Sequence, residues 1–252
     1  MKKKENIAIL FQCTGVLALG LYMVWLWLTL QRPPFITLGE TRICYSFFLM
    51  LLGGITYWRW RMPFLLVFTD LLAVLFLIIN ICKPETESQV LMPALQSVWF
   101  IPHVAIYMFG YAVIGCAFVL AVRELFFNNL TAKNAKQVQR AQRMNNLNFC
   151  PLRLNLLITI GTNALGMGLC FGALWAKKAW GQYWSWDIKE TAALITWAIF
   201  LLYLHLQKFT KISRKYLLIL IITGFLSLNF TWYGVKFLPA GEKSSHLFYS
   251  TK

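Results

Sequence analysis

The sequence predicts an all-α fold, a polytopic integral membrane helix bundle of about seven transmembrane helices. Of the 252 residues, 59% are hydrophobic and only 13% are charged, whereas an average soluble domain has roughly 25% charged residues. The apolar residues gather in runs of the length that a bilayer-spanning helix needs, about 20 residues. A helix also satisfies its own backbone hydrogen bonds, as lipid demands. We therefore predict a single membrane domain over residues 1–252.

The apolar runs follow one another along the chain and define the expected spans. The first run comes after Lys2, Lys3 and Lys4. It is too long for the hydrophobic region of a typical signal peptide, so we interpret it as a transmembrane helix. Residues 123–153 are polar and basic, and we interpret them as an inner connector with a helical extension. The expected spans are residues 7–30, 42–59, 63–82, 102–122, 154–176, 188–206 and 216–238.

The basic residues predict the orientation of these spans. The formal net charge is +15, and on a soluble protein such a charge would indicate binding to nucleic acid. Here the lysines and arginines lie between apolar runs, many of them in residues 123–153 and 208–215. An inner N-terminus puts these segments on the inner side, as the positive-inside rule requires. We predict an inner N-terminus, an outer C-terminus and no binding to nucleic acid.

The six cysteines exclude two classes of site. They lie at positions 13, 44, 82, 116, 150 and 170, and no pair has C-x-x-C spacing. The chain therefore contains neither the haem attachment motif of a c-type cytochrome nor a zinc ribbon. Most of these cysteines lie within apolar runs, where cysteine behaves as a small hydrophobic residue.

Aromatic residues are concentrated between the fifth and sixth spans, on the predicted outer side. Trp180, Tyr183, Trp184 and Trp186 fall within seven residues, with Gly181 among them. Tryptophan and tyrosine gather at membrane interfaces, so an aromatic belt is one interpretation. The other is a ligand surface, because such rings stack on a planar apolar macrocycle. The residues alone leave both interpretations open.

Asp187 and Glu190 follow this cluster with the spacing of a helix capping box. We expect the Asp187 side chain to accept hydrogen bonds from the free amides at the start of the sixth span. A fixed helix start would also fix the tryptophan loop before it. The structural role of Asp187 is therefore compatible with a role in binding.

The chain has three histidines, and two of them fall on the predicted outer side. His103 begins the fourth span and His246 lies in the outer tail, whereas His205 is near the inner end of the sixth span. Histidine is an axial ligand of haem iron. Two outer histidines would place one imidazole on each face of a haem at the tryptophan loop. A structural role is the alternative for each histidine.

Three charged residues have two interpretations each. Lys177 and Lys178 precede the tryptophan loop, where they would either meet the propionates of a haem or lie solvated at the interface. Asp70 lies within the third span, where a carboxylate is costly. We favour a structural hydrogen bond within the bundle for Asp70, and the alternative is a path for haem.

The motif around the tryptophans resembles that of a known family. The run W-G-x-x-W-x-W-D at 180–187 continues with K-E-T at 189–191 and Y-L-H at 203–205. It closely resembles the WWD signature of the haem-handling membrane proteins of cytochrome c biogenesis. It looks most like the CcsA (ResC) branch of system II, and more distantly like CcmC. The resemblance divides the chain into an N-terminal three-helix part, 1–95, and a CcsA/CcmC-like haem-binding core, 96–252, with the WWD loop at 177–190.

The resemblance implies two haem sites. In this family haem b is held against the external WWD loop, and two external histidines bind the iron. His103 matches the first by its context, W-F-I-P-H-V at 99–104, and His246 would be the second by order and side alone. His205 matches a membrane-embedded histidine of a second haem site, whose partner histidine comes from a companion protein. The residues implied for the external haem are His103, His246, Trp180, Trp184, Trp186 and Asp187.

The resemblance also implies partners and a location. Together with a CcsB (ResB)-type membrane protein, such a chain exports haem and presents it for thioether attachment to apocytochrome c at C-x-x-C-H. It would be the haem-handling subunit of a cytochrome c synthase in the lipid bilayer. The alternatives are a non-catalytic haem transporter or chaperone of CcmC type, and an unrelated transporter with a tryptophan belt. The expected location is the bacterial cell (inner) membrane, with the WWD loop on the outer, periplasmic side.

Overall fold

A computed structural model of the chain describes residues 2–82, 97–131, 149–209 and 212–238, and this part is helical with no strand. Seven of its helices are long and apolar enough to cross a membrane, as the sequence predicted, so the protein is a multi-pass membrane protein. The helices are α1 (Lys2–Leu30), α2 (Leu38–Trp60), α3 (Pro63–Cys82), α4 (Phe100–Thr131), α6 (Phe149–Trp180), α7 (Ile188–Phe209) and α8 (Arg214–Asn229), followed by the π-helical turn η3 (Phe230–Gly234) and the 3₁₀ turn η4 (Val235–Phe237).

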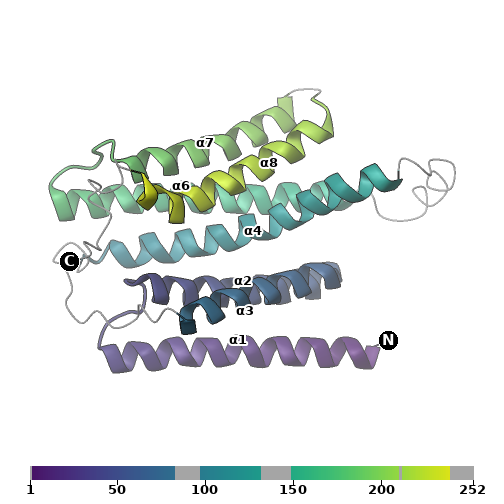
Figure 1. Ribbon diagram of the computed structural model, residues 1–252, viewed down its shortest axis with the longest axis horizontal. Helices are drawn as coiled ribbons and strands as arrows, with labels where there is room; N and C mark the ends of the chain where they lie inside the picture. The colour runs from purple at the N-terminus through teal and green to yellow at the C-terminus, as the bar shows by residue number, and fades with distance from the viewer. Residues whose placement is uncertain (1, 83–96, 132–148, 210–211, 239–252) are drawn as a thin grey trace.

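Helix α4 lies at the centre of the bundle and packs against α2, α6 and α8 (Figure 1). The large apolar side chains of this core are fully buried, among them Ile114 of α4, Ile158 of α6 and Phe200 of α7. Helix α1 lies on the outside of the bundle and packs on α2, and most of its apolar side chains are exposed. Since hydrocarbon tails are as apolar as these side chains, lipid suits this exposed surface.

Several connections meet at one end of the bundle, on the left in Figure 1. They are the α1–α2 loop, the start of α4, the α6–α7 loop and the turn η3. The sequence predicted that the segment before His103 and the tryptophan loop share one side of the membrane. The structure places residues 97–103 and the α6–α7 loop at this same end, which we call the loop end. Which side of the membrane the loop end faces stays a prediction.

Helix α6 extends four residues into the segment that the sequence assigned to a loop. Residues 177–180 form its last turn, so the loop itself covers 181–187. Lys177 and Lys178 suit the negative end of the helix dipole. The helix ends where Gly181 takes a φ of 82°, and its amide donates to the Lys177 carbonyl. This left-handed cap is accessible to glycine without strain.

Polar contacts hold α1 against its neighbours within the apolar bundle. Gln12 of α1 is buried, and its amide donates to Asp70 of α3 at 3.0 Å and to the Met50 carbonyl of α2 at 2.7 Å. Such hydrogen bonds between helices stabilise membrane bundles. The predicted structural hydrogen bond of Asp70 is thus confirmed.

We expect Gly53→Ala to destabilise the bundle. A Cβ atom at Gly53 would lie 2.1 Å from the Thr69 hydroxyl oxygen of α3, so α2 and α3 would have to separate, at a cost of about 1–3 kcal/mol. Gly20→Ala is the matched control, because its Cβ would meet Phe47 at 3.5 Å, an ordinary contact. Thermal unfolding in detergent should show a lower midpoint for Gly53→Ala alone. An unchanged midpoint would contradict the tight α2–α3 contact.

Candidate functional site

A cavity of about 240 Å³ opens within the loop end of the bundle. Its walls come from the α1–α2 loop, from α4 and α6, from the α6–α7 loop with the start of α7, and from η3. The lining is mostly apolar and aromatic with a few polar groups, which is the usual make-up of a small-molecule site. Segments separated by almost 200 residues in the sequence therefore build one site.

His103 is the histidine of this cavity, and α6 fixes its ring. It lies in the first turn of α4, and its Nδ1 is 2.8 Å from the Gly168 carbonyl oxygen of α6. A carbonyl oxygen only accepts, so Nδ1 carries the proton and the lone pair of the neutral ring is on Nε2. Gly172 permits this position, because a Cβ there would lie 2.7 Å from Cε1 of the ring.

Aromatic side chains surround the imidazole and extend down the cavity. The His103 ring is stacked near Trp175, with centroids 5.6 Å apart, and meets the edge of Tyr107 at 4.9 Å. Trp175 is only 1% exposed. A second series runs from Tyr107 to Tyr111 and on to Trp232 of η3, with centroids 5.5–5.8 Å apart. The site thus combines one oriented imidazole with planar apolar walls.

The three tryptophans for which the sequence predicted a common role, Trp180, Trp184 and Trp186, take different positions. Trp184 lines the cavity, and its Nε1 is a buried donor without a partner in the part of the chain that the structure describes. Trp186 is 70% exposed, has a φ of 58°, and meets Trp184 edge-on at 5.8 Å. Trp180 packs edge-on against Trp175 at 4.7 Å and lines a second cavity of about 210 Å³. Of these three tryptophans, only Trp184 therefore lines the larger cavity.

A capping box holds the start of α7, as the sequence predicted. The Asp187 carboxylate accepts from the Lys189 amide at 2.8 Å. In return the Glu190 carboxylate accepts from the Asp187 amide at 3.2 Å and from the Ser185 amide at 2.8 Å. These bonds satisfy amides that the helix leaves without partners. They also fix residues 184–187, so the cap positions Trp184.

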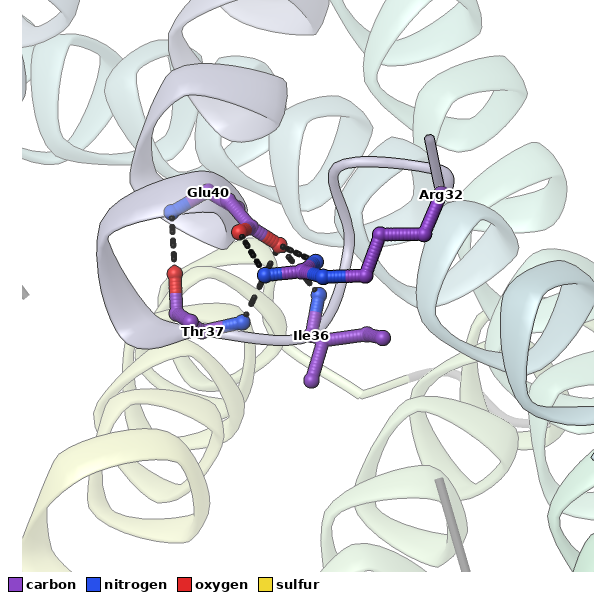
Figure 2. Close-up of polar contacts among 4 residues, drawn as sticks. All are labelled: Arg32, Ile36, Thr37 and Glu40. Carbon is purple, nitrogen blue, oxygen red and sulfur yellow. Dashed lines mark hydrogen bonds and ion pairs between the residues drawn. The ribbon is translucent and has the colours of Figure 1, made fainter. Parts of the chain in front are cut away.

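A second capping box holds the start of α2 (Figure 2), another of the elements that line the cavity. Thr37 accepts from the Glu40 amide, and Glu40 accepts from the amides of Ile36 and Thr37. Glu40 is 1% exposed and also forms a two-pronged ion pair with Arg32, at 2.8 and 3.0 Å. Thr37 and Leu38 line the cavity. The Arg32–Glu40 ion pair therefore holds in place the part of the cavity wall that the α1–α2 loop forms.

The lysines near the cavity divide into two groups. Lys177 donates from Nζ to the Gly181 carbonyl at 2.8 Å and lies 5.3 Å from the centre of the Tyr183 ring, so it fixes the loop. Lys178 is exposed and is not part of the cavity lining. Lys189, in the first turn of α7, does line the cavity. The lysine that lines the cavity, Lys189, thus follows the tryptophan loop, whereas the sequence analysis considered Lys177 and Lys178, which precede it.

The other two histidines are not brought to this cavity by the described structure. His205 lies in the last two turns of α7, at the opposite end of the bundle, where it is exposed and its ring is 4.8 Å from that of Phe209. His246 lies outside the described residues. The structure therefore joins His103 with Trp184 in the lining of one cavity. Asp187 does not line that cavity but caps α7 beside it, and His205 is separate from all three.

Several lining residues were missed by the sequence analysis. Trp175 and Trp232 lie within apolar runs, where a tryptophan is typical of a membrane interface. The α1–α2 loop gave a weak signal, because Thr37-x-x-Glu40 has capping-box spacing. No local pattern says that this loop, 66 residues before His103, lies across the cavity from α7.

Similarity to known proteins covers nearly the whole chain. A family model described as cytochrome C assembly protein matches residues 15–242. The chain is 31% identical over 278 residues to the cytochrome c biogenesis protein CcsA of Atropa belladonna, covering 98% of this chain and 86% of that protein. It is 30% identical over 274 residues to the CcsA protein of Cuscuta exaltata, with the same coverage. The CcsA protein of Lactuca sativa is 30% identical over 285 residues, covering 96% of this chain and 84% of that protein.

We expect Arg32→Met to destabilise the protein by about 3 kcal/mol, because it leaves the buried Glu40 carboxylate without its cation. Adding Glu40→Gln should restore part of this loss. The matched pair is Arg214 and Glu124 at the opposite end, which also bond at 2.8 Å but are more exposed. A double-mutant cycle from denaturant unfolding should give a larger coupling for Arg32 with Glu40. Equal couplings would contradict a special role for the buried pair.

Proposed function

Because the chain belongs to the cytochrome c assembly protein family, we propose that its cavity holds haem and presents it to apocytochrome c. Family membership places the protein in cytochrome c biogenesis, and its helices make it a multi-pass membrane protein. The observation that carries the proposal is His103: its Nδ1 is bonded to α6, and the ring lies in a cavity walled by aromatic side chains. A histidine held through its other nitrogen is the usual ligand arrangement for a metal.

The chemistry of the lining fits a metal carried in a macrocycle. Within the described residues no group of three or more His, Cys, Asp or Glu side chains could hold a metal ion. A single imidazole among aromatic rings suits iron whose other ligands come from a porphyrin. Trp184 supplies a flat face and a buried N–H without a partner in the described part. Trp186 packs edge-on against Trp184, and Trp180 packs edge-on against Trp175.

The polar edge of the cavity fits the propionates of haem. Lys189 lines the cavity and supplies a positive charge. Helices α2, α4 and α7 all begin at this cavity, and the positive ends of their dipoles favour an anion there. The volume of about 240 Å³ is below the roughly 300–1,000 Å³ of a typical small-molecule site. We infer that one edge of the haem projects, which leaves its vinyl groups accessible to the acceptor.

In the proposed reaction, haem is the cargo and the chain supplies orientation. His103 holds the iron from one face, and His246, outside the described residues, holds it from the other. His205 is the chain's ligand in a second haem site at the opposite end, completed by a CcsB (ResB)-type partner, through which haem is exported. Fixing the porphyrin plane against the walls aligns its vinyl groups with the thiols of C-x-x-C-H, and such alignment can replace a strong catalytic group.

The loop end would then face the compartment in which cytochrome c matures. For a bacterial cell membrane this is the periplasmic side. The lysines and arginines of the described chain support this orientation, because Arg59, Arg61 and Arg153 lie at the opposite end of the bundle.

The absorption spectrum of the purified protein tests haem binding. We expect haem in the wild type, loss of it in His103→Gly, and retention of a trapped complex in His246→Gly. Gly172→Ala should lower haem affinity at least about tenfold, because its Cβ displaces the imidazole from the Gly168 carbonyl. Gly20→Ala is the control for a helical Gly→Ala change. A colourless wild-type protein, or full haem in His103→Gly, would contradict the proposal.

The propionate contact is tested by Lys189→Met, with Lys177→Met as the matched control. We expect Lys189→Met to weaken haem binding about fivefold, the upper range for a partly exposed ion pair. Lys177→Met should leave it nearly unchanged, because Lys177 bonds the loop backbone. Haem titrations at two salt concentrations should also show a smaller salt dependence for Lys189→Met. A larger effect from Lys177 would reverse the assignment.

A further inference from the structure

Glu190 lies where two cavities meet. It lines the larger cavity together with His103 and Trp184. It also lines the second cavity, of about 210 Å³, together with Ala176, Trp180, Gln182 and Ser185. The side chain therefore borders both the proposed haem site and a separate space next to it, although the whole residue is only 9% exposed.

Only one oxygen of this carboxylate is used by the helix cap. Oε2 accepts from the Ser185 amide, the Ser185 hydroxyl and the Asp187 amide. Among the described residues no hydrogen bond is made to Oε1. In Glu40, the corresponding residue of the other capping box, both oxygens are bonded to Arg32. Glu190 thus has a fixed position and one carboxylate oxygen available for chemistry.

The second cavity differs from the first in its chemistry. Its lining contains Gln182, Ser185 and Trp180, which carry an amide, a hydroxyl and an indole. Amide and hydroxyl groups can form hydrogen bonds with the backbone of a bound peptide, and an indole can pack against the apolar side chains of that peptide. Such a lining suits a polypeptide segment, whereas the aromatic walls around His103 suit a flat macrocycle.

We propose that Glu190 is the proton-transfer residue of haem attachment and that the second cavity admits the cysteine-bearing segment of the acceptor polypeptide. This inference rests on the proposed function, because it requires haem in the larger cavity. A carboxylate between the two cavities would lie between the thiol and the vinyl group. A general base must be within hydrogen-bond reach of the proton that it moves.

The reaction is an addition without net oxidation or reduction. The Glu190 carboxylate takes the proton as the thiol S–H bond breaks, and the sulfur forms a bond to the vinyl carbon attached to the porphyrin ring. The vinyl double bond becomes a single bond. The protonated Glu190 then gives its proton to the terminal vinyl carbon, which becomes a methyl group. The carboxylate is regenerated for the second thiol and the second vinyl group.

Glu190→Gln separates proton transfer from capping, because the glutamine carbonyl oxygen can still accept from the Ser185 and Asp187 amides. The full chain should be co-expressed with a CcsB (ResB)-type protein and tested with a peptide containing C-x-x-C-H. We expect unchanged haem content and thermal midpoint, an unchanged KM for the peptide, and a kcat for thioether formation lowered at least about 100-fold. Glu124→Gln, at the opposite end of the bundle, is the matched control and should keep the wild-type kcat.

Filling the second cavity tests the acceptor site independently. Ala176→Leu should raise the KM for the peptide about tenfold while haem stays bound. A wild-type kcat in Glu190→Gln would overturn the proton-transfer role, and so would loss of haem from that variant. An unchanged KM in Ala176→Leu would overturn the acceptor site. A wild-type protein that binds haem but attaches none would overturn this inference and leave a haem carrier, whereas one without haem would overturn the proposed function itself.

Discussion

The close approach of α4 and α6 sets the geometry on which the site depends. Gly168 and Gly172 lie on α6 where Tyr107 and His103 of α4 press against it, and a Cβ at either glycine would come within 2.8 Å of these rings. Small residues at a helix interface let backbones approach, which in lipid takes the place of a hydrophobic driving force. The same approach brings the Gly168 carbonyl to Nδ1 of His103. The contact that packs α4 against α6 therefore also orients the imidazole of His103.

The two capping boxes complete this arrangement from either side. The box at α7 fixes the segment that carries Trp184, and the box at α2 fixes the wall of the α1–α2 loop. Each uses a buried glutamate, yet the two differ in what the carboxylate does. Glu40 is neutralised by Arg32, so its role is structural. Glu190 has no such cation bonded to it in the described part of the chain. The same local motif thus has a structural role at Glu40, whereas at Glu190 it leaves one carboxylate oxygen for the proton transfer that we propose.

Local sequence patterns predicted the helices and the helix cap, which depend on neighbouring residues in the chain. They predicted little of the cavity wall, which depends on how the helices pack. The seven spans follow from the length of apolar runs, and the cap at Asp187 and Glu190 follows from their spacing. His103 and Trp184 were singled out from residue type, clustering and predicted side of the membrane, and a resemblance of short motifs then suggested their roles. The wall formed by Trp175, and the contribution of η3, could not be found this way, because they depend on which helices lie side by side. The end of α6 was placed four residues early, since basic residues after an apolar run resemble a loop when they also complete a helical turn.

The pairing of Arg32 with Glu40 has a consequence for how the chain enters the bilayer. Arg32 lies just after α1 and Glu40 lies in the first turn of α2, eight positions later, so their charges can neutralise each other as soon as these two helices have been synthesised. A charged group that enters hydrocarbon alone is costly. Insertion of α1 and α2 as a helical hairpin, with the Arg32–Glu40 ion pair already formed, avoids that cost. The first two helices would then form a preassembled surface on which the later helices that line the cavity pack.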